Sequence, residues 1–172
     1  MIRHWLLMRL TDWLPAREIR GDHGEDYLER YYVIRAFGIT AYLHRFLADD
    51  SDRGLHDHPW SWALSLILVG QYDEIRRDRT RRRRWVNWLR GDTFHRITLV
   101  PGTRICWTLF IHGPYVKPWG FLEPIVDDDS GNWKNCLMFV PFDYGGAGTH
   151  SQRGWYTRAP KGRELRRARG WS

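Results

Sequence analysis

The chain has 172 residues, a length typical of one domain, and 42% of them are hydrophobic, which is enough for a sizeable packed core. Its 27 Lys and Arg residues against 20 Asp and Glu residues give a net charge of +7, which raises the question of an acidic partner. No stretch approaches the about 18 apolar residues of a membrane span, and no apolar signal-peptide core follows the first residues. We therefore expect a cytoplasmic protein that does not bind membranes.

The N-terminal lead, residues 1–26, contains apolar residues at helical spacing over 2–14, and Pro15 follows them. This pattern predicts a short helix that ends at the proline. The two cysteines, Cys106 and Cys136, lie too far apart in the sequence to form a disulfide framework. We expect buried thiols in a reducing compartment, with a single disulfide as the alternative.

The central region, residues 27–142, favours strands up to about residue 121, followed by a loop at 127–131 and one further possible strand. Short aromatic and β-branched runs recur about every ten residues with turn residues between them, which indicates an antiparallel sandwich or barrel. The expected strands lie at 27–34, 39–46, within 55–69, and at 72–75, 85–89, 93–100, 104–112 and 137–141. The charged segment 76–84 is expected to be a hairpin tip or loop.

The C-terminal region, residues 143–172, is rich in Gly and Arg and poor in aliphatic residues. This composition predicts a loosely structured basic tail. The part at 163–169 could form a short basic helix or an arm that becomes ordered on an acidic partner.

The most informative motif is His56-Asp57-His58. Residues i and i+2 of a strand point to the same face, so the two imidazoles could reach one metal ion. His95, in the expected strand at 93–100, is our candidate for the third ligand. The spacing does not distinguish Fe(II), Zn, Ni or Mn, and a histidine pair on a strand often binds nothing, so that alternative stays open.

Two further histidines lie in expected strands. His44 precedes the His56 segment and could face the same cavity, although a structural role is the simpler interpretation. His112 stands at the end of its strand beside Gly113, with no pattern that indicates a function.

These motifs resemble those of the cupin superfamily. His56-x-His58 followed by an apolar strand to Gly70 is similar to the first cupin motif, and Gly91-Asp92 followed by His95 is similar to the second. Longer runs resemble a group of small cupin-like proteins of bacteria and their phages, at 42–46, 52–60, 95–97, 107–110, 113–114 and 119–121. The resemblance implies an all-β, double-stranded β-helix (a jelly-roll barrel) that holds one divalent metal ion through three histidines.

The chain departs from the first cupin motif at the expected carboxylate ligand. Trp62 and Ala63 occupy those positions. Trp62 has the parity of His56 and His58, so we expect it to face inward, and Glu74 has that parity beyond the Gly70 turn. The resemblance then implies a site of three histidines plus water or substrate, a type that includes thiol dioxygenases.

Aromatic and basic residues near these motifs are candidates for ligand binding. We expect Trp60, Trp62 and Trp107 to line the mouth of the barrel. Arg45 and Arg104 are candidates for holding a carboxylate or phosphate of a small ligand.

The run Arg81, Arg82, Arg83 and Arg84 could instead bind nucleic acid, although a solvated hairpin tip is the simpler interpretation. Two functions therefore remain open. One is a metal-dependent enzyme, dioxygenase-like, acting on a small polar molecule. The other is a non-catalytic module that binds a small ligand or nucleic acid. A homodimer paired through sheet edges is compatible with either.

Overall fold

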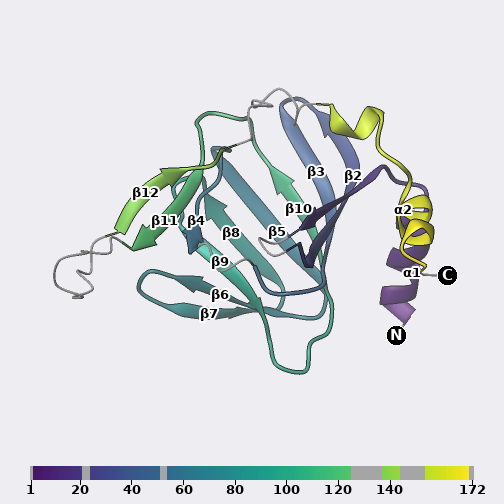
Figure 1. The fold of residues 1–172 in the computed structure, drawn as a ribbon, viewed down its shortest axis with the longest axis horizontal. Helices are drawn as coiled ribbons and strands as arrows, with labels where there is room; N and C mark the ends of the chain where they lie inside the picture. The colour runs from purple at the N-terminus through teal and green to yellow at the C-terminus, as the bar shows by residue number, and fades with distance from the viewer. Residues whose placement is uncertain (1, 21–23, 51–53, 125–136, 144–153, 171–172) are drawn as a thin grey trace.

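The strands form two six-stranded antiparallel sheets, which confirms the expected all-β architecture (Figure 1). The computed structural model describes residues 2–20, 24–50, 54–124, 137–143 and 154–170. In spatial order the first sheet contains β1 (Ala16–Arg20), β2 (Asp26–Ala36), β3 (Ile39–Phe46), β10 (Cys106–His112), β5 (Trp62–Val69) and β8 (Val86–Arg90). The second contains β12 (Leu137–Pro141), β11 (Gly120–Pro124), β4 (Leu55–His56), β9 (His95–Leu99), β6 (Tyr72–Arg76) and β7 (Thr80–Arg83).

From β3 onward the chain passes repeatedly from one sheet to the other, as in a jelly roll. One turn between the sheets depends on Gly70, which joins β5 to β6 with φ of 78°. A Cβ atom there would also lie 2.5 Å from the carbonyl oxygen of Ile105. Glycine satisfies both constraints, since it tolerates positive φ and presents no side chain.

Apolar side chains fill one end of the space between the sheets. Phe46 and Ile67 of the first sheet pack with Tyr72 and Ile97 of the second in a single buried cluster. Alternation along each strand places these residues on one face and a different set on the other. The core therefore joins the two sheets, and Phe46, Tyr72 and Ile97 also form part of the lining of the adjoining cavity.

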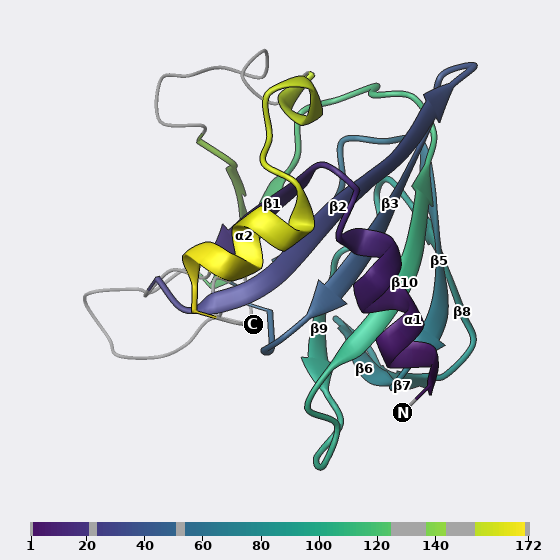
Figure 2. The same cartoon turned by 90° about the vertical axis from the view of Figure 1, so that its right-hand side faces the viewer.

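Two helices cover the outer face of the first sheet (Figure 2). They are α1 (Ile2–Thr11) and α2 (Gly162–Ala168), and they come from opposite ends of the chain. Between them and the sheet lie Tyr31, Trp107 and Leu165. Within the described residues, neither helix is long and apolar enough to cross a bilayer.

Residues 154–170 fall within the region expected as a flexible tail, and they are folded. They form the short 3-10 helix η2 (Trp155–Thr157) and α2. Arg166 of α2 is buried, where it donates a hydrogen bond of 2.9 Å to Tyr31 Oη and pairs with Asp12. Residues 144–153 and 171–172 of the expected tail lie outside the described residues.

Several elements differ from the sequence expectation. The expected loop at 76–84 contains β7, which pairs with β6 and forms ion pairs across the hairpin. The strands β1 and β11 were not predicted from the sequence. The helix α1 ends at Thr11, whose hydroxyl turns back to the Leu7 carbonyl at 2.9 Å.

Candidate metal centre

Three histidines converge at the end of the second sheet. His56 and His95 are register partners across the β4–β9 pair, so their side chains lie on the same face. His58 follows β4 by two residues. One ring nitrogen from each histidine lies within 4.8 Å of the other two, and the Nε2 atoms of His58 and His95 are 2.8 Å apart. The structure thus brings together the three histidines that the spacing singled out.

Carboxylates face the outer nitrogens of two of these rings. His95 Nδ1 lies 3.3 Å from Glu74 Oε1, and His56 Nδ1 lies 3.2 Å from Asp50 Oδ2. A carboxylate on Nδ1 favours the tautomer whose Nε2 lone pair is available to a metal ion and fixes the orientation of the ring. Neither contact was expected from the sequence, although Glu74 has the inward parity.

Glu74 is fully buried and surrounded by donors. Arg76 and Asn87 donate to Oε1 at 2.9 and 3.0 Å, and Arg83 Nη2 donates to Oε2 at 2.6 Å. Burial alone would raise the pKa of Glu74, but the bonds from His95 and these residues hold that pKa well below its usual value. Glu74 is therefore a stable anion beside His95.

The environment keeps His58 neutral. Burial lowers its pKa well below the usual value, and the neighbouring His95 and His56 lower it further. A metal ligand must present an unprotonated nitrogen, so the neutral form of His58 is the one able to bind a metal. Trp60 packs against the His58 ring with centroids 5.0 Å apart, which restricts its orientation.

The donor set suits a divalent ion. Metal–nitrogen bonds to histidine of about 2.0–2.1 Å require ligand nitrogens close to one another, as they are in this cluster. Among the described residues, no carboxylate joins the three imidazoles as a fourth ligand. Three neutral imidazoles are compatible with Fe(II), Zn, Ni and Mn, and they leave coordination positions for water or a ligand.

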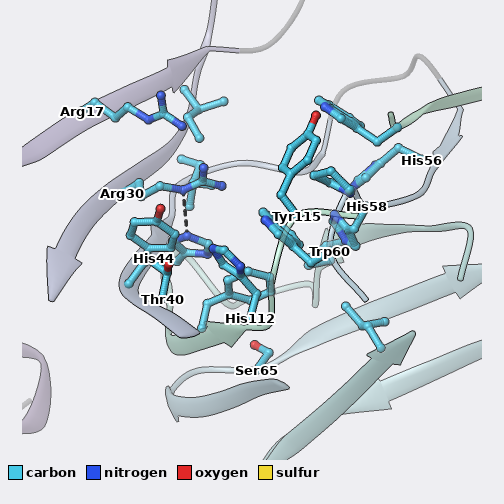
Figure 3. A pocket seen from close by; sticks show the side chains of 18 of the residues that line it. Arg17, Arg30, Thr40, His44, His56, His58, Trp60, Ser65, His112 and Tyr115 are labelled. Atoms are coloured by element: carbon cyan, nitrogen blue, oxygen red, sulfur yellow. Dashed lines mark hydrogen bonds between the residues drawn. The ribbon is translucent and has the colours of Figure 1, made fainter. Parts of the chain in front are cut away.

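The three histidines line one side of a cavity of about 500 Å³ between the sheets (Figure 3). The opposite side is formed by β2 and β3, which contribute Arg30 and His44. Trp60 and Tyr115 lie between the two sides. A volume of this size is typical of a site for a small organic ligand.

Two further histidines face this cavity. His44 Nε2 accepts a hydrogen bond of 2.9 Å from Arg30 Nε, and burial lowers its pKa well below the usual value. His112 Nδ1 lies 2.7 Å from the carbonyl oxygen of Gly113, to which it donates, so its Nε2 is an acceptor. Burial lowers the pKa of His112 to about 4, with a smaller contribution from Arg30. The sequence had offered the cavity as one position for His44, beside a structural role, whereas no pattern had indicated a function for His112.

The expected ligand-binding residues lie in different places. Trp60 lines the cavity. Arg45 of β3 and Trp107 of β10 both lie on the face of the first sheet that is turned away from the cavity. There Arg45 pairs with Glu29 at 3.1 Å, and Trp107 packs beneath the helices. They lie there because the strands alternate, and His44 takes the inward position next to Arg45.

Trp62 and Arg104 also lie away from the cavity lining. The residues between His58 and β5 do not continue the strand, so parity is not carried from His58 to Trp62. Trp62 instead stacks on Trp88 at 5.4 Å on the outer face of the first sheet. Arg104 is exposed, shortly before β10.

The basic run belongs to the β6–β7 hairpin. Arg82 Nε donates to Asp73 at 3.0 Å, and Arg83 is engaged by Glu74. Arg81 and Arg84 are exposed. The run thus contributes two side chains to structural ion pairs and two to the surface. Cys106 is a buried free thiol, and Cys136 lies outside the described residues.

No protein-family model matches the sequence, and no curated protein matches it either. The chain is similar to the solved structure of Fe(II) HppE, with 15% identity and a TM-score of 0.48, over 58% of this chain and 56% of that one. It is also similar to the DMSP lyase DddQ from Ruegeria pomeroyi, with 16% identity and a TM-score of 0.48, over 63% and 60% of the two chains. A cupin superfamily protein from Desulfitobacterium hafniense matches at 16% identity and a TM-score of 0.43, over 57% and 84%. This chain therefore spans little more than half the length of HppE.

Of these three structures, the Desulfitobacterium hafniense protein is described as a cupin superfamily protein.

Proposed function

We propose that the protein binds one divalent metal ion through His56, His58 and His95 and acts as a metal-dependent enzyme on a small molecule held in the adjoining cavity. The observation that supports this is the convergence of three imidazole nitrogens, all within 4.8 Å of one another, beside a cavity of about 500 Å³. Free coordination positions and a ligand cavity in one place are what metal-assisted catalysis requires.

The protein's own residues would position and shield the reacting groups. Asp50 and Glu74 orient the rings of His56 and His95 through their Nδ1 atoms. Trp60 packs on His58 and, with other aromatic side chains, reduces the water content of the cavity. When bound, the ion would supply a Lewis acid or, as Fe(II), a redox centre for dioxygenase-like chemistry.

The test compares metal-free protein with protein loaded separately with Fe(II), Zn(II), Ni(II) or Mn(II). Oxygen uptake and consumption of small thiols, catechols and organic acids would be followed for each form. We expect turnover with one of these metals, and none in His56→Ala. His4→Ala is the matched control, because His4 lies on α1 and contacts Trp107 outside the cavity. Turnover that is equal with and without metal would contradict the proposal.

A non-catalytic module is the alternative, and the same samples distinguish it. Full metal occupancy with ligand binding and no turnover would assign the cavity to a binding protein. Nucleic-acid binding would instead appear as salt-dependent retention on heparin or DNA that is lost when the exposed Arg81 and Arg84 of the basic run are changed to Gln. A homodimer through sheet edges is tested by light scattering.

A further inference from the structure

Arg30 places a positive charge in the wall of the cavity, facing away from the helices. It belongs to β2 and lines the cavity on the side opposite the three histidines (Figure 3). Its Nε donates to His44 Nε2 at 2.9 Å, and its guanidinium lies 5.1 Å from the centre of the Tyr42 ring. Both neighbours are neutral, so neither balances the charge. Among the described residues, no carboxylate pairs with Arg30.

Five other arginines that are buried or half-buried face carboxylates. Arg45 pairs with Glu29 at 3.1 Å, and Arg76 pairs with Glu74 at 2.9 Å. The same is true of Arg83, Arg166 and Arg169. Arg30 differs from these because its side chain points into the cavity rather than into a packed layer.

The two carboxylates that line the cavity are directed to other groups. Glu18 pairs with Arg20 at 3.3 Å and with Arg169. Asp50 lies 3.2 Å from His56 Nδ1. The described lining contains four arginines against these two carboxylates, so it is positive overall.

Arg30 is half-buried in the cavity wall. A partly desolvated guanidinium without a counter-charge is stabilised when a ligand supplies the anion. We propose that the Arg30 side of the cavity is the binding site for the anionic group of a small organic acid, a carboxylate or a phosphonate. Placing the rest of that acid at the metal rests on the proposed function, but the anion site itself does not. Arg suits this role because its planar donors match two oxygens of such an anion.

A series of stacked rings connects Arg30 to the metal centre. The Tyr42 ring lies beside Arg30 and stacks on His112, with centroids 5.7 Å apart. His112 stacks on Trp60 at 4.2 Å, and Trp60 stacks on His58 at 5.0 Å. Such a wall accommodates the flat apolar body of an acid whose far end reaches the three histidines.

His112 adds a preference for a hydrogen-bond donor on that body. Its Nδ1–H is committed to the carbonyl oxygen of Gly113 at 2.7 Å, so Nε2 is the acceptor. The ring lies midway in the stacked series, between Tyr42 and Trp60. The chemistry therefore favours a small, flat organic acid that carries a hydroxyl or amino group.

The test measures binding of three probes of similar shape by calorimetry. They are 4-hydroxybenzoate, phenylphosphonate and the neutral 4-hydroxybenzamide. Each is titrated into metal-free and Zn(II)-loaded protein, with metal content measured in the same samples. We expect one or both acids to bind both forms, and the amide to bind about 10- to 100-fold more weakly, as expected for loss of a charged hydrogen bond. The better of the two acids identifies the anion.

Arg30→Gln is the informative variant, and Arg90→Gln is its control, since Arg90 pairs with Asp92 on the surface. We expect Arg30→Gln to lose the preference for acid over amide, Arg30→Lys to recover part of it, and Arg90→Gln to retain it. In the absence of ligand, Arg30→Gln should melt at or above the temperature of the wild type, because it removes an unpaired charge. A clear drop in melting temperature would indicate a structural role for Arg30.

The outcomes separate the two proposals. Equal binding of acid and amide by metal-loaded wild type would overturn the anion site and leave the metal site standing. Acid binding that needs the metal and ignores Arg30→Gln would also overturn it, because the anion would then be a metal ligand. Acid binding that depends on Arg30 in a protein that takes up no metal would sustain the anion site and contradict the proposed function.

Discussion

Glu74 Oε1 lies 3.3 Å from Nδ1 of His95, on the side of the ring away from the other two histidines. Four further bonds from Arg76, Arg83 and Asn87 hold the carboxylate in place. The orientation of a candidate metal ligand is thus tied to a buried ion-pair network that extends to the β6–β7 hairpin. This relationship makes the hairpin part of the site's support.

Glu74→Gln should weaken metal binding about 10- to 100-fold, because it removes the carboxylate that orients the His95 ring. The measurement is a competitive titration of metal-free protein with a coloured chelator. Asp73→Asn is the control, since Asp73 pairs with the exposed Arg82 on the other face of the same strand. Equal losses in the two variants would show that the hairpin as a whole, rather than the Glu74–His95 contact, is responsible.

Gly91→Ala should also weaken metal binding. A Cβ atom at this position would lie 1.9 Å from the carbonyl oxygen of Trp60, so the segment that carries His58 would have to move. His58 N also donates to the Gly91 carbonyl at 3.2 Å, which ties the two segments together. The neighbouring Asp92→Ala, at an exposed position, should bind metal as the wild type does. Unchanged affinity in Gly91→Ala would show that His58 does not depend on this contact.

The stability of the metal-free protein should fall as the pH drops from about 6.5 towards 4. His112 has a usual pKa of 6.5 and a pKa of about 4 when folded, so the unfolded chain binds more protons in this window. The contribution of His112 to stability is fully present above pH 6.5 and is lost as the pH falls towards 4. The shift corresponds to about 3 kcal/mol for this residue alone. The free energy of unfolding in urea should depend less steeply on pH in His112→Gln than in the wild type. An equal dependence on pH in the two proteins would contradict the lowered pKa of His112.

Arg166→Gln should destabilise the protein by about 2–4 kcal/mol, because it removes the ion pair with Asp12 and the hydrogen bond to the Tyr31 hydroxyl. Urea unfolding measures the change. Arg167→Gln, at an exposed position on the same helix, should change stability by less than about 0.5 kcal/mol. Equal stability of Arg166→Gln and the wild type would mean that α2 contributes little to the fold.

The sequence predicted that the three histidines come together, because the spacing of the motif suggested strand geometry. His95 lies directly across from His56, and His58, two residues beyond β4, points to the same cluster. Strand 39–46 was likewise predicted with the bounds that β3 shows. Local periodicity is enough for such elements, since it depends on neighbours in the chain.

Other features depend on how the chain bends between strands. Trp62 was expected inward, but the turn after His58 breaks the alternation, so its side chain lies on the outer face. Asp50 and Glu74 reach the histidines only after the sheet is assembled. The folded part of the basic C-terminal region also depends on tertiary contacts, since Arg166 reaches Asp12 at the other end of the chain.

The most direct test is elemental analysis of protein purified without a histidine tag or chelator, beside a His56→Ala/His58→Ala variant. We expect about one divalent metal per chain in the wild type and none in the variant, whose fold is checked by circular dichroism. The element found would select the reactions to test. A wild-type protein that carries no metal and also fails to take up added Fe(II), Zn(II), Ni(II) or Mn(II) would contradict the metal site.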